Sequence, residues 1–111
     1  MKLEVGMYVR TKDKIVKIEK ISDGVMWDTQ GHVHFGDFIK ASHNIIDLIE
    51  EGDYVNGQKV FDKLYDELNK CWYLKLEIGE VFGKYARTYQ QHIKSIVTKE
   101  QFSSMEYKIN E

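Results

Sequence analysis

A short motif that occurs twice limits what this chain can fold into. Gly6-Met7-Tyr8-Val9 returns 46 positions later as Gly52-Asp53-Tyr54-Val55. Farther along each half, Ile39-Lys40-Ala41-Ser42 resembles Ile93-Lys94-Ser95-Ile96, so the two landmarks keep their order. Self-similarity at a spacing of tens of residues indicates a repeated structural unit. Two such units account for a chain of 111 residues.

The residues between these landmarks predict strands in both halves. Residues 14–21 are rich in β-branched side chains, and a turn signal at Ser22-Asp23-Gly24 separates them from a second alternating run over 25–28. In the second half, Asn56-Gly57 lies between strand-like residues and predicts a tight hairpin, because both residues tolerate positive φ. Residues 72–78 then alternate between apolar and mixed positions, which is typical of a strand with one buried face.

Residues 61–70 allow two interpretations. Phe61, Leu64, Tyr65 and Leu68 have the spacing of a helix face. The match to the first half instead favours a strand through Leu64 or Tyr65, followed by a loop over 66–70.

Both halves end in helical-turn signals. Ser42-His43-Asn44 offers capping side chains before residues 45–49, and Thr98 to Gln101 form a capping box with Phe102 as its anchor. Residues 105–109 alternate as a closing strand. We therefore expect a mostly β fold of two tandem Src-homology-3-like barrel lobes with short helical turns, over residues 1–49 and 50–111. The second lobe would carry a loop insertion near residues 79–93.

Lobes of this size bury little surface, so we expect them to share an interface. The linking residues 45–55 contain no Pro and one Gly, which favours nearly continuous extended chain. Trp27 and Trp72 align between the halves, and core packing is the expected role of both.

Charge and composition narrow the functional classes. The net charge is −2, and each half sums to −1, so overall charge predicts no polyanion partner. No apolar run is long enough to cross a bilayer, and residues 1–6 lack the apolar segment of a secretion signal. The single Cys71 cannot form an internal disulfide. We expect a cytoplasmic protein without membrane contact.

Residues 81–99 contain no acidic side chain and mix cations with tyrosines, and their polarity predicts an exposed loop. The predicted partner-binding residues there are Lys84, Tyr85, Arg87, Tyr89, His92 and Lys94. Protein contact is favoured, because interfaces are enriched in Tyr and Arg. Binding of single-stranded nucleic acid is the alternative, helped by a second basic region at Arg10, Lys12, Lys14, Lys17 and Lys20.

Other candidate sites are weaker. His32 and His34 share a strand face and could meet one metal with His43, but Asp37 is the only carboxylate close in sequence. A polar strand face near a turn is the favoured interpretation. The sequence has no phosphate-binding glycine loop or paired zinc motif, and Cys71 has no neighbouring His. We expect no metal, no cofactor and no enzymatic activity.

Three segments carry a resemblance to a known group. Residues 42–57 (SHNIIDLIEEGDYVNG), 5–12 (VGMYVRTK) and 93–102 (IKSIVTKEQF) resemble small uncharacterised proteins from phages and prophages of Gram-positive bacteria. The resemblance implies a mobile-element origin and a bacterial host cytoplasm. It implies a non-enzymatic accessory protein that binds a host or phage protein, with inhibition of a host defence nuclease, as CRISPR inhibitors do, as the refinement. Asp47, Glu50, Glu51 and Asp53 could then mimic phosphates, but ordinary surface and turn chemistry is the favoured interpretation of these acids.

Overall fold

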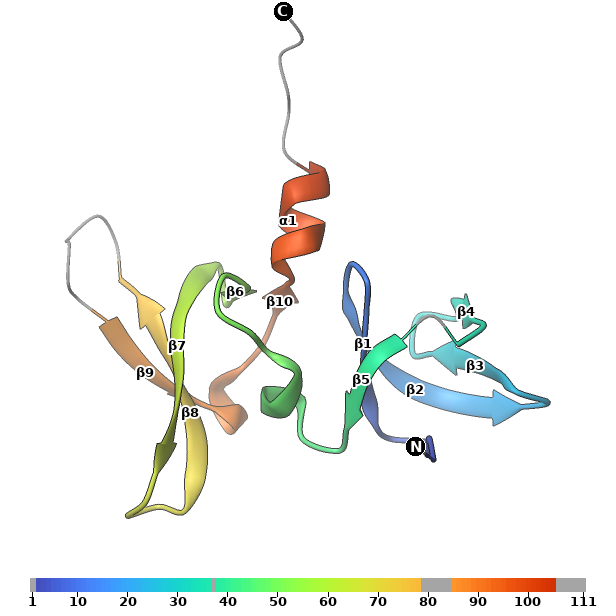
Figure 1. Ribbon diagram of the computed structural model, residues 1–111, viewed down its shortest axis with the longest axis horizontal. Helices are drawn as coiled ribbons and strands as arrows, with labels where there is room; N and C mark the ends of the chain where they lie inside the picture. The colour runs from blue at the N-terminus through green and yellow to red at the C-terminus, as the bar shows by residue number, and fades with distance from the viewer. Residues whose placement is uncertain (1, 37, 79–84, 106–111) are drawn as a thin grey trace, which may run out of the picture.

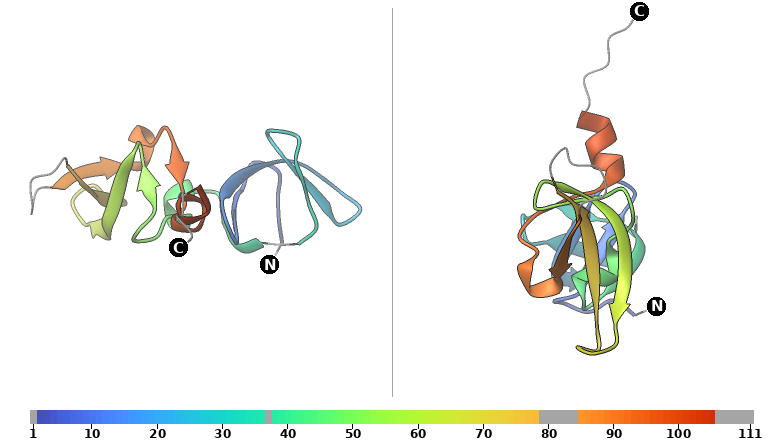
Figure 2. Two further views of the ribbon diagram at one scale, coloured as in Figure 1. Left: turned by 90° about the horizontal axis from the view of Figure 1, so that it is seen from above. Right: turned by 90° about the vertical axis from the view of Figure 1, so that its left-hand side faces the viewer.

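Two five-stranded antiparallel sheets form the body of the protein, seen side by side in Figures 1 and 2. The structure is a computed structural model that describes residues 2–36, 38–78 and 85–105. The first sheet contains β1 (Tyr8–Thr11), β2 (Ile15–Ser22), β3 (Val25–Asp28), β4 (Val33–His34) and β5 (Phe38–Ser42). The second contains β6 (Tyr54–Val55), β7 (Gln58–Asp66), β8 (Cys71–Glu77), β9 (Tyr85–Tyr89) and β10 (Ile96–Val97). The predicted mostly β fold is confirmed.

The two sheets have equivalent strand orders. The first runs β4-β3-β2-β1-β5, and the second runs β9-β8-β7-β6-β10. Neither sheet is closed into a barrel by strand pairing among the described residues, so the barrel part of the prediction is not confirmed. The physical reason lies in the edges: β4 and β10 have two residues each and offer few backbone groups for a closing ladder.

The repeated motif builds the same backbone turn in both sheets. Gly6 and Gly52 both have a φ of +94°, a conformation that side-chain-bearing residues rarely adopt. The N–H of Gly6 donates to the carbonyl of Ile18 at 3.0 Å, and the N–H of Gly52 donates to that of Val60 at 2.9 Å. The N–H groups of Ile18 and Val60 donate in turn to the carbonyl of the residue after each glycine, Met7 or Asp53. The repetition found in the sequence is therefore present in the hydrogen bonding.

The second pair of landmarks is displaced by one residue from the sequence match. Tyr8 pairs with Ser42 in the first sheet, and Tyr54 pairs with Val97 in the second. Ser42 is thus equivalent to Val97, whereas the sequence match aligned it with Ile96. That match depended on an Ile-Lys pair, and because Ile39 is exposed, its apolar character does not indicate which face of the strand is buried. A slip of one residue matters because it exchanges the two faces of a strand.

The β6–β7 hairpin forms at Asn56-Gly57 as predicted, with φ of +53° and +80°. β7 continues to Asp66, which confirms the strand interpretation of this segment. The helix-like spacing of Phe61 and Leu64 arises from a β-bulge, because the register shifts between Val60 and Asp62. The extra residue, Phe61, turns to the same side of the sheet as Leu64.

The described part of the chain also contains three short helices: η1 (Ile45–Leu48), η2 (Gln90–His92) and α1 (Lys99–Met105). The 3-10 turn of η1 corrects the expectation of extended chain over residues 45–55. Residues three apart share a side in a 3-10 turn, so Ile46 and Ile49 can both enter the core of the second sheet. No helix in the described part of the chain has the length and apolarity needed to span a membrane.

The start of α1 follows its predicted cap. The Thr98 hydroxyl accepts from the N–H of Gln101 at 3.1 Å and donates to the carbonyl of Asp13, in the turn between β1 and β2. Phe102 stacks on Tyr54 with ring centroids 4.3 Å apart. Met105 belongs to α1 and not to the predicted closing strand, and residues 106–109 lie outside the described residues.

A buried ion cluster joins the two sheets. The Arg10 guanidinium, from β1, donates to both carboxylate oxygens of Asp53 at 2.6 and 2.9 Å and to the Leu48 carbonyl at 2.9 Å. It also donates to Glu100 of α1 at 2.9 Å. Asp53 further accepts from two backbone N–H groups, those of residues 50 and 99.

Apolar packing crosses between the sheets at the same place. The first core contains Met7, Val9, Ile18 and Met26; the second contains Ile46, Ile49, Val55, Val60, Leu74 and Leu76. Ile15, from β2 of the first sheet, packs against the second core. The two units therefore share an interface of ion pairs and apolar contacts.

Candidate protein-binding surface

The predicted partner-binding residues lie mainly on a strand, not on a loop. Tyr85–Tyr89 form β9, which pairs with β8 in unbroken register from Tyr73↔Tyr89 to Glu77↔Tyr85. The loop expectation is wrong for these five residues because the polar positions alternate and only one face of β9 meets the core. Lys84 and the rest of 79–84 lie outside the described residues.

Alternation gathers three of the predicted residues on one side of the second sheet. Thr88 is buried and points with Ala86 toward the core, so Tyr85, Arg87 and Tyr89 point away from it. Register carries this side across the neighbouring strands. We call it the outer face, and it consists of Phe61, Asp62, Leu64, Asp66, Tyr73, Lys75, Glu77, Tyr85, Arg87 and Tyr89.

The aromatic side chains of the outer face contact one another directly. Phe61 stacks on Tyr85 with centroids 4.4 Å apart and an interplanar angle of 24°. The Arg87 guanidinium lies 4.9 Å from the centre of the Tyr73 ring, and Tyr73 lies 5.7 Å from Tyr89. Stacked rings and a cation over a ring each stabilise their own geometry. The bulge at Phe61 is what brings its ring to this side.

Exposure is uneven along the outer face. Phe61 is 47% exposed and Tyr85 is 37% exposed, although both are large and apolar enough to be buried. Tyr73 is only 8% exposed beneath its neighbours. The outer face therefore has a pair of exposed rings, Phe61 and Tyr85, and a separate buried ring, Tyr73, that contacts Arg87 and Tyr89.

Asp66, the last residue of β7, accepts several hydrogen bonds at one end of the outer face. Its carboxylate accepts from the side chain of Asn69 at 2.9 Å and from the Tyr89 hydroxyl at 2.8 Å. These bonds, Asn69 first and Tyr89 second, lower the pKa of Asp66 to about 2. The hydrogen bond to Asp66 also raises the pKa of Tyr89. Asp66 is therefore ionised and Tyr89 neutral at ordinary pH.

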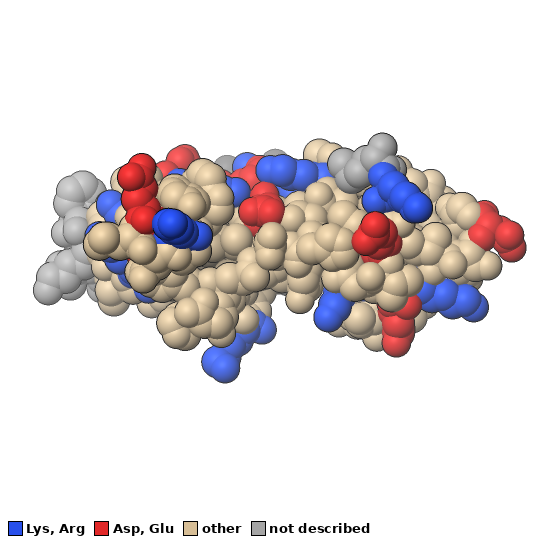
Figure 3. Space-filling view, turned by 90° about the horizontal axis from the view of Figure 1, so that it is seen from below, with Lys and Arg blue, Asp and Glu red and all other residues tan. Residues whose placement is uncertain are grey.

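The charges of the outer face do not favour a polyanion. Lys75 and Arg87 are its two cations, and Asp62, Asp66 and Glu77 are its three anions. Register places Asp62 opposite Lys75, which pairs opposite charges across the strands. The face of the molecule drawn in Figure 3 likewise shows both signs dispersed, with no large area of one sign.

The two remaining predicted residues lie beyond β9. His92, in η2, makes an edge contact with the Tyr89 ring at 6.5 Å. Lys94 donates its backbone N–H to the Asn56 side chain at 2.8 Å, which fixes its backbone at the hairpin turn. The structure thus brings Tyr85, Arg87 and Tyr89 together, places His92 at their border, and adds Phe61 and Tyr73.

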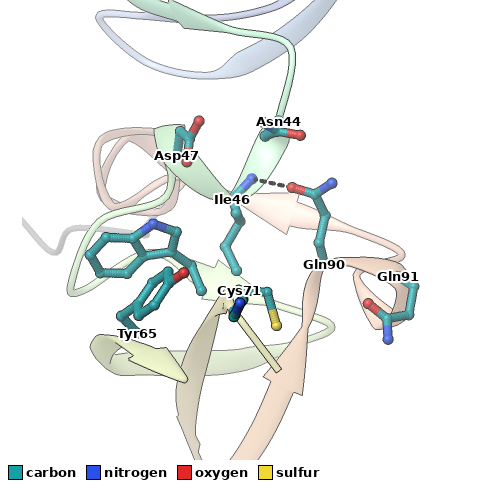
Figure 4. A pocket seen from close by; sticks show the side chains of 9 residues that line it. Asn44, Ile46, Asp47, Tyr65, Cys71, Gln90 and Gln91 are labelled. Atoms are coloured by element: carbon teal, nitrogen blue, oxygen red, sulfur yellow. Dashed lines mark hydrogen bonds between the residues drawn. The ribbon is translucent and has the colours of Figure 1, made fainter. Parts of the chain in front are cut away.

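A cleft opens beside the far end of the β7–β8 hairpin, between that hairpin, η1 and η2 (Figure 4). Its volume is about 470 Å³, and its lining includes Ile46, Tyr65, Cys71, Trp72 and Gln90. The Tyr65 and Trp72 rings meet edge to face at 5.3 Å. The Ile46 N–H donates to the Gln90 side chain at 3.3 Å across the cleft.

Neither tryptophan is part of a core. Trp72 is 44% exposed, because the hairpin extends past the last core residue, Leu74. Trp27 is half-buried under the Lys20 ammonium, 4.9 Å from its ring. The two tryptophans are not at equivalent positions of the two sheets. Just after the bulge, Trp27 pairs with Lys20 in the first sheet and Lys75 pairs with Asp62 in the second, so the residue equivalent to Trp27 is Lys75.

His32 and His34 converge on Asp28, a carboxylate that the sequence analysis did not consider. Asp28 lies 3.0 Å from His34 and 3.6 Å from His32, and it also accepts from the N–H groups of Gln30 and His32. Burial acts to raise the pKa of Asp28, but the hydrogen bonds from His34, His32 and Gln30 outweigh it and lower the pKa. His43 contacts Glu4 instead.

No group of three or more His, Cys, Asp or Glu side chains in the described ranges is arranged to bind a metal ion. The acids proposed as phosphate mimics do not form an open acidic strip either. Asp53 is fully buried against Arg10, and Glu50 pairs with Lys99 at 2.8 Å. Arg10 itself is 1% exposed, so it does not belong to a basic surface.

No protein-family model, curated protein or solved structure matches the chain. Among the described residues, the outer face combines an exposed aromatic pair with a nearby cation–ring contact. The period of two in residues 85–89 is the sequence signal that places Tyr85, Arg87 and Tyr89 on one side of a strand.

Proposed function

We propose that the chain is a non-enzymatic binding protein that docks onto another protein through the outer face of its second sheet. The observation that carries the proposal is the exposed Phe61–Tyr85 stack beside the Arg87–Tyr73 contact. Rigid aromatic rings and Arg are the side chains that contribute most to protein–protein affinity. Because these rings already contact each other in the free protein, little side-chain entropy is lost when they are covered.

Protein is favoured over nucleic acid as the partner because of the charges on the outer face. Nucleic-acid affinity comes largely from cations placed along phosphates. Here three carboxylates accompany two cations, and the low pKa of Asp66 keeps it anionic. A base could stack on Tyr85, but its phosphate would meet no excess of positive charge.

We further propose a phage or prophage origin and a target in the host or phage proteome, with a host defence nuclease as the refinement. These parts rest on the resemblance of residues 5–12, 42–57 and 93–102. The contact would be made by the outer face and not by acids that imitate phosphates, because Asp53 is buried against Arg10 and Glu50 is paired with Lys99.

We propose as well that the two units are open variants of the Src-homology-3-like barrel. In support, each unit has five antiparallel strands, with its first strand between its second and its last. In the second unit a 3-10 turn, η2, precedes the last strand, β10. Such a unit exposes one face of a long hairpin, which is where the outer face lies.

Affinity capture with matched variants tests the binding proposal. The immobilised protein is compared with a Phe61→Ser/Tyr85→Ser double variant in lysate of a Gram-positive bacterium, with mass spectrometry as the readout. We expect the double variant to lose its specific partner, with at least about a tenfold drop in affinity once the partner is purified.

Phe35→Ser is the matched control, because Phe35 is 79% exposed but lies in the first unit, directly after β4. It should capture the partner as the wild type does. Thermal unfolding of all three proteins checks that they are folded. Equal capture by the double variant and the wild type would reject the outer face. Binding to short DNA or RNA that falls steeply with salt and requires Arg87 would favour the nucleic-acid alternative.

A further inference from the structure

β9 forms one edge of the second sheet, and it lacks the features that usually protect an edge. Its partner on one side is β8, and no strand among the described residues pairs with its other side. It has five residues, no Pro, Gly or Lys, and no irregularity in its register. A long, regular edge presents unpaired N–H and C=O groups in the positions needed by an added strand.

The other three edges are blunted. β4 and β10 have two residues each, which is too short to template a strand. β5 contains Lys40, and the register shift opposite Arg10 and Thr11 makes Ile39 a bulge. Short strands, lysines and bulges are the devices by which natural proteins prevent edge pairing. Only β9 among these four edges has none of them.

The side chains of β9 on the outer face determine which side chains an added strand should have. Tyr85, Arg87 and Tyr89 lie on the outer face at alternate positions, so an added strand would place every second side chain next to them. Arg87 has no carboxylate within ion-pair distance in the described part of the chain, and it is exposed. Its guanidinium lies over the Tyr73 ring and hydrogen-bonds with the Tyr89 side chain, and because a guanidinium has five N–H donors, donors remain at the rim.

We propose that β9 accepts an extended segment of the partner protein as a sixth strand. The segment carries an Asp or Glu opposite Arg87 and apolar side chains two residues to either side, over Tyr85 and Tyr89. Main-chain hydrogen bonds would supply affinity, and the carboxylate and apolar side chains would supply specificity. This inference rests on the proposed function and names the mode by which the outer face binds.

A symmetric peptide tests the inference without knowledge of the natural partner. The peptide Thr-Phe-Thr-Asp-Thr-Phe-Thr reads the same in both directions, so parallel and antiparallel addition present the same face. It is titrated into ¹⁵N-labelled full-length protein by NMR. We expect shift changes concentrated at the amides of residues 85–89. Replacing the peptide Asp by Lys should weaken binding about two- to fivefold, and Arg87→Glu should reverse that preference.

Backbone N-methylation separates strand addition from simple side-chain contact. In an extended strand, alternate N–H groups face opposite edges, so methylation at Phe, Asp and Phe blocks one edge and methylation at the Thr residues blocks the other. The symmetric peptide can reverse its direction and present its unblocked edge, so each of these two peptides should still bind, and we expect only a peptide methylated at every residue to lose binding. Binding by the fully methylated peptide, or no shift at residues 85–89 at millimolar unmethylated peptide, overturns strand addition.

A second copy of the chain is the competing occupant of the edge. Concentration-dependent shifts at residues 85–89 without peptide would assign the edge to self-association and overturn the proposal. The two proposals fail separately. If capture requires Phe61 and Tyr85 while the peptide leaves β9 unperturbed, strand addition fails alone. If capture survives loss of both rings, the proposed function fails whatever the peptide does.

Discussion

Replacing Arg10 by Met should cost a large part of the protein's stability. The change removes hydrogen bonds from the guanidinium to Asp53, the Leu48 carbonyl and Glu100, and leaves the Asp53 carboxylate buried without its counter-charge. Removing one partner of a buried ion pair costs about 3–5 kcal/mol. A single domain is typically stable by about 5–15 kcal/mol, so the loss is a substantial fraction.

Urea unfolding followed by tryptophan fluorescence measures the effect in each unit. Trp27 reports on the first sheet and Trp72 on the second, so Trp72→Phe and Trp27→Phe variants give separate signals. At a slope of about 2 kcal/mol per molar urea, Arg10→Met should lower the midpoint by roughly 2 M. Both signals should shift, because the cluster joins the two sheets.

Glu50→Gln is the control for this prediction. Glu50 is partly exposed and pairs with Lys99 at 2.8 Å, and exposed pairs contribute less than about 1 kcal/mol. Arg10→Met/Asp53→Asn should lose less than the sum of its single changes, because no charge is then left buried alone. A loss under about 1 kcal/mol for Arg10→Met, or wild-type transitions of Trp27 and Trp72 at different urea concentrations, would refute the reasoning.

Three smaller predictions concern local contacts. Thr98→Val removes the helix cap and the bond to the Asp13 carbonyl, and should cost about 1–3 kcal/mol in thermal unfolding, whereas Thr98→Ser should stay near wild type. The folded-state pKa of Asp28 is lowered, so its contribution is full above about pH 5 and is lost as pH falls through that pKa; Asp28→Asn should flatten this acid limb of stability, and an unchanged limb would contradict the assignment. Gly57→Ala places a side chain at a φ of +80° and should cost about 1–2 kcal/mol by urea unfolding.

Local patterns in the sequence predict the parts of the fold that depend on neighbouring residues. The Asn56-Gly57 hairpin, the β7 strand and the Thr98 cap all follow from residues within a few positions of one another. Strand β9 is not predicted in this way, because an edge strand with one face in solvent contains too few apolar residues to differ from a loop. Its residues do alternate with a period of two, but their polarity is equally typical of an exposed loop.

Contacts between distant residues explain the other differences. Arg10 reads as part of a basic strand, and its partner Asp53 is 43 positions away, so composition alone places both at the surface. A signal was nevertheless present in the repeat. The position after the glycine is Met7 in the first copy, where it is buried, and Asp53 in the second. A charge at an equivalent buried position requires a buried partner.

The sequence predicts only part of the outer face, because some of its residues meet only in the folded sheet. Residue type points to Tyr85, Arg87 and Tyr89, whereas Phe61 reaches them through a bulge and Tyr73 through strand pairing. Register of this kind is set by the folded sheet. It could not be derived from the spacing of the residues along the chain.

Site-specific photo-crosslinking tests the central claim most directly, because it asks which face of the protein touches a partner inside cells. A photoreactive phenylalanine derivative replaces Tyr85 in one variant and Phe35 in another, and both are expressed in a Gram-positive bacterium. Both positions are exposed and aromatic, so the probe changes each in a similar way. We predict a discrete crosslinked protein from position 85 that is absent from position 35. Crosslinking from position 35 alone, or no specific adduct from position 85, would contradict the account.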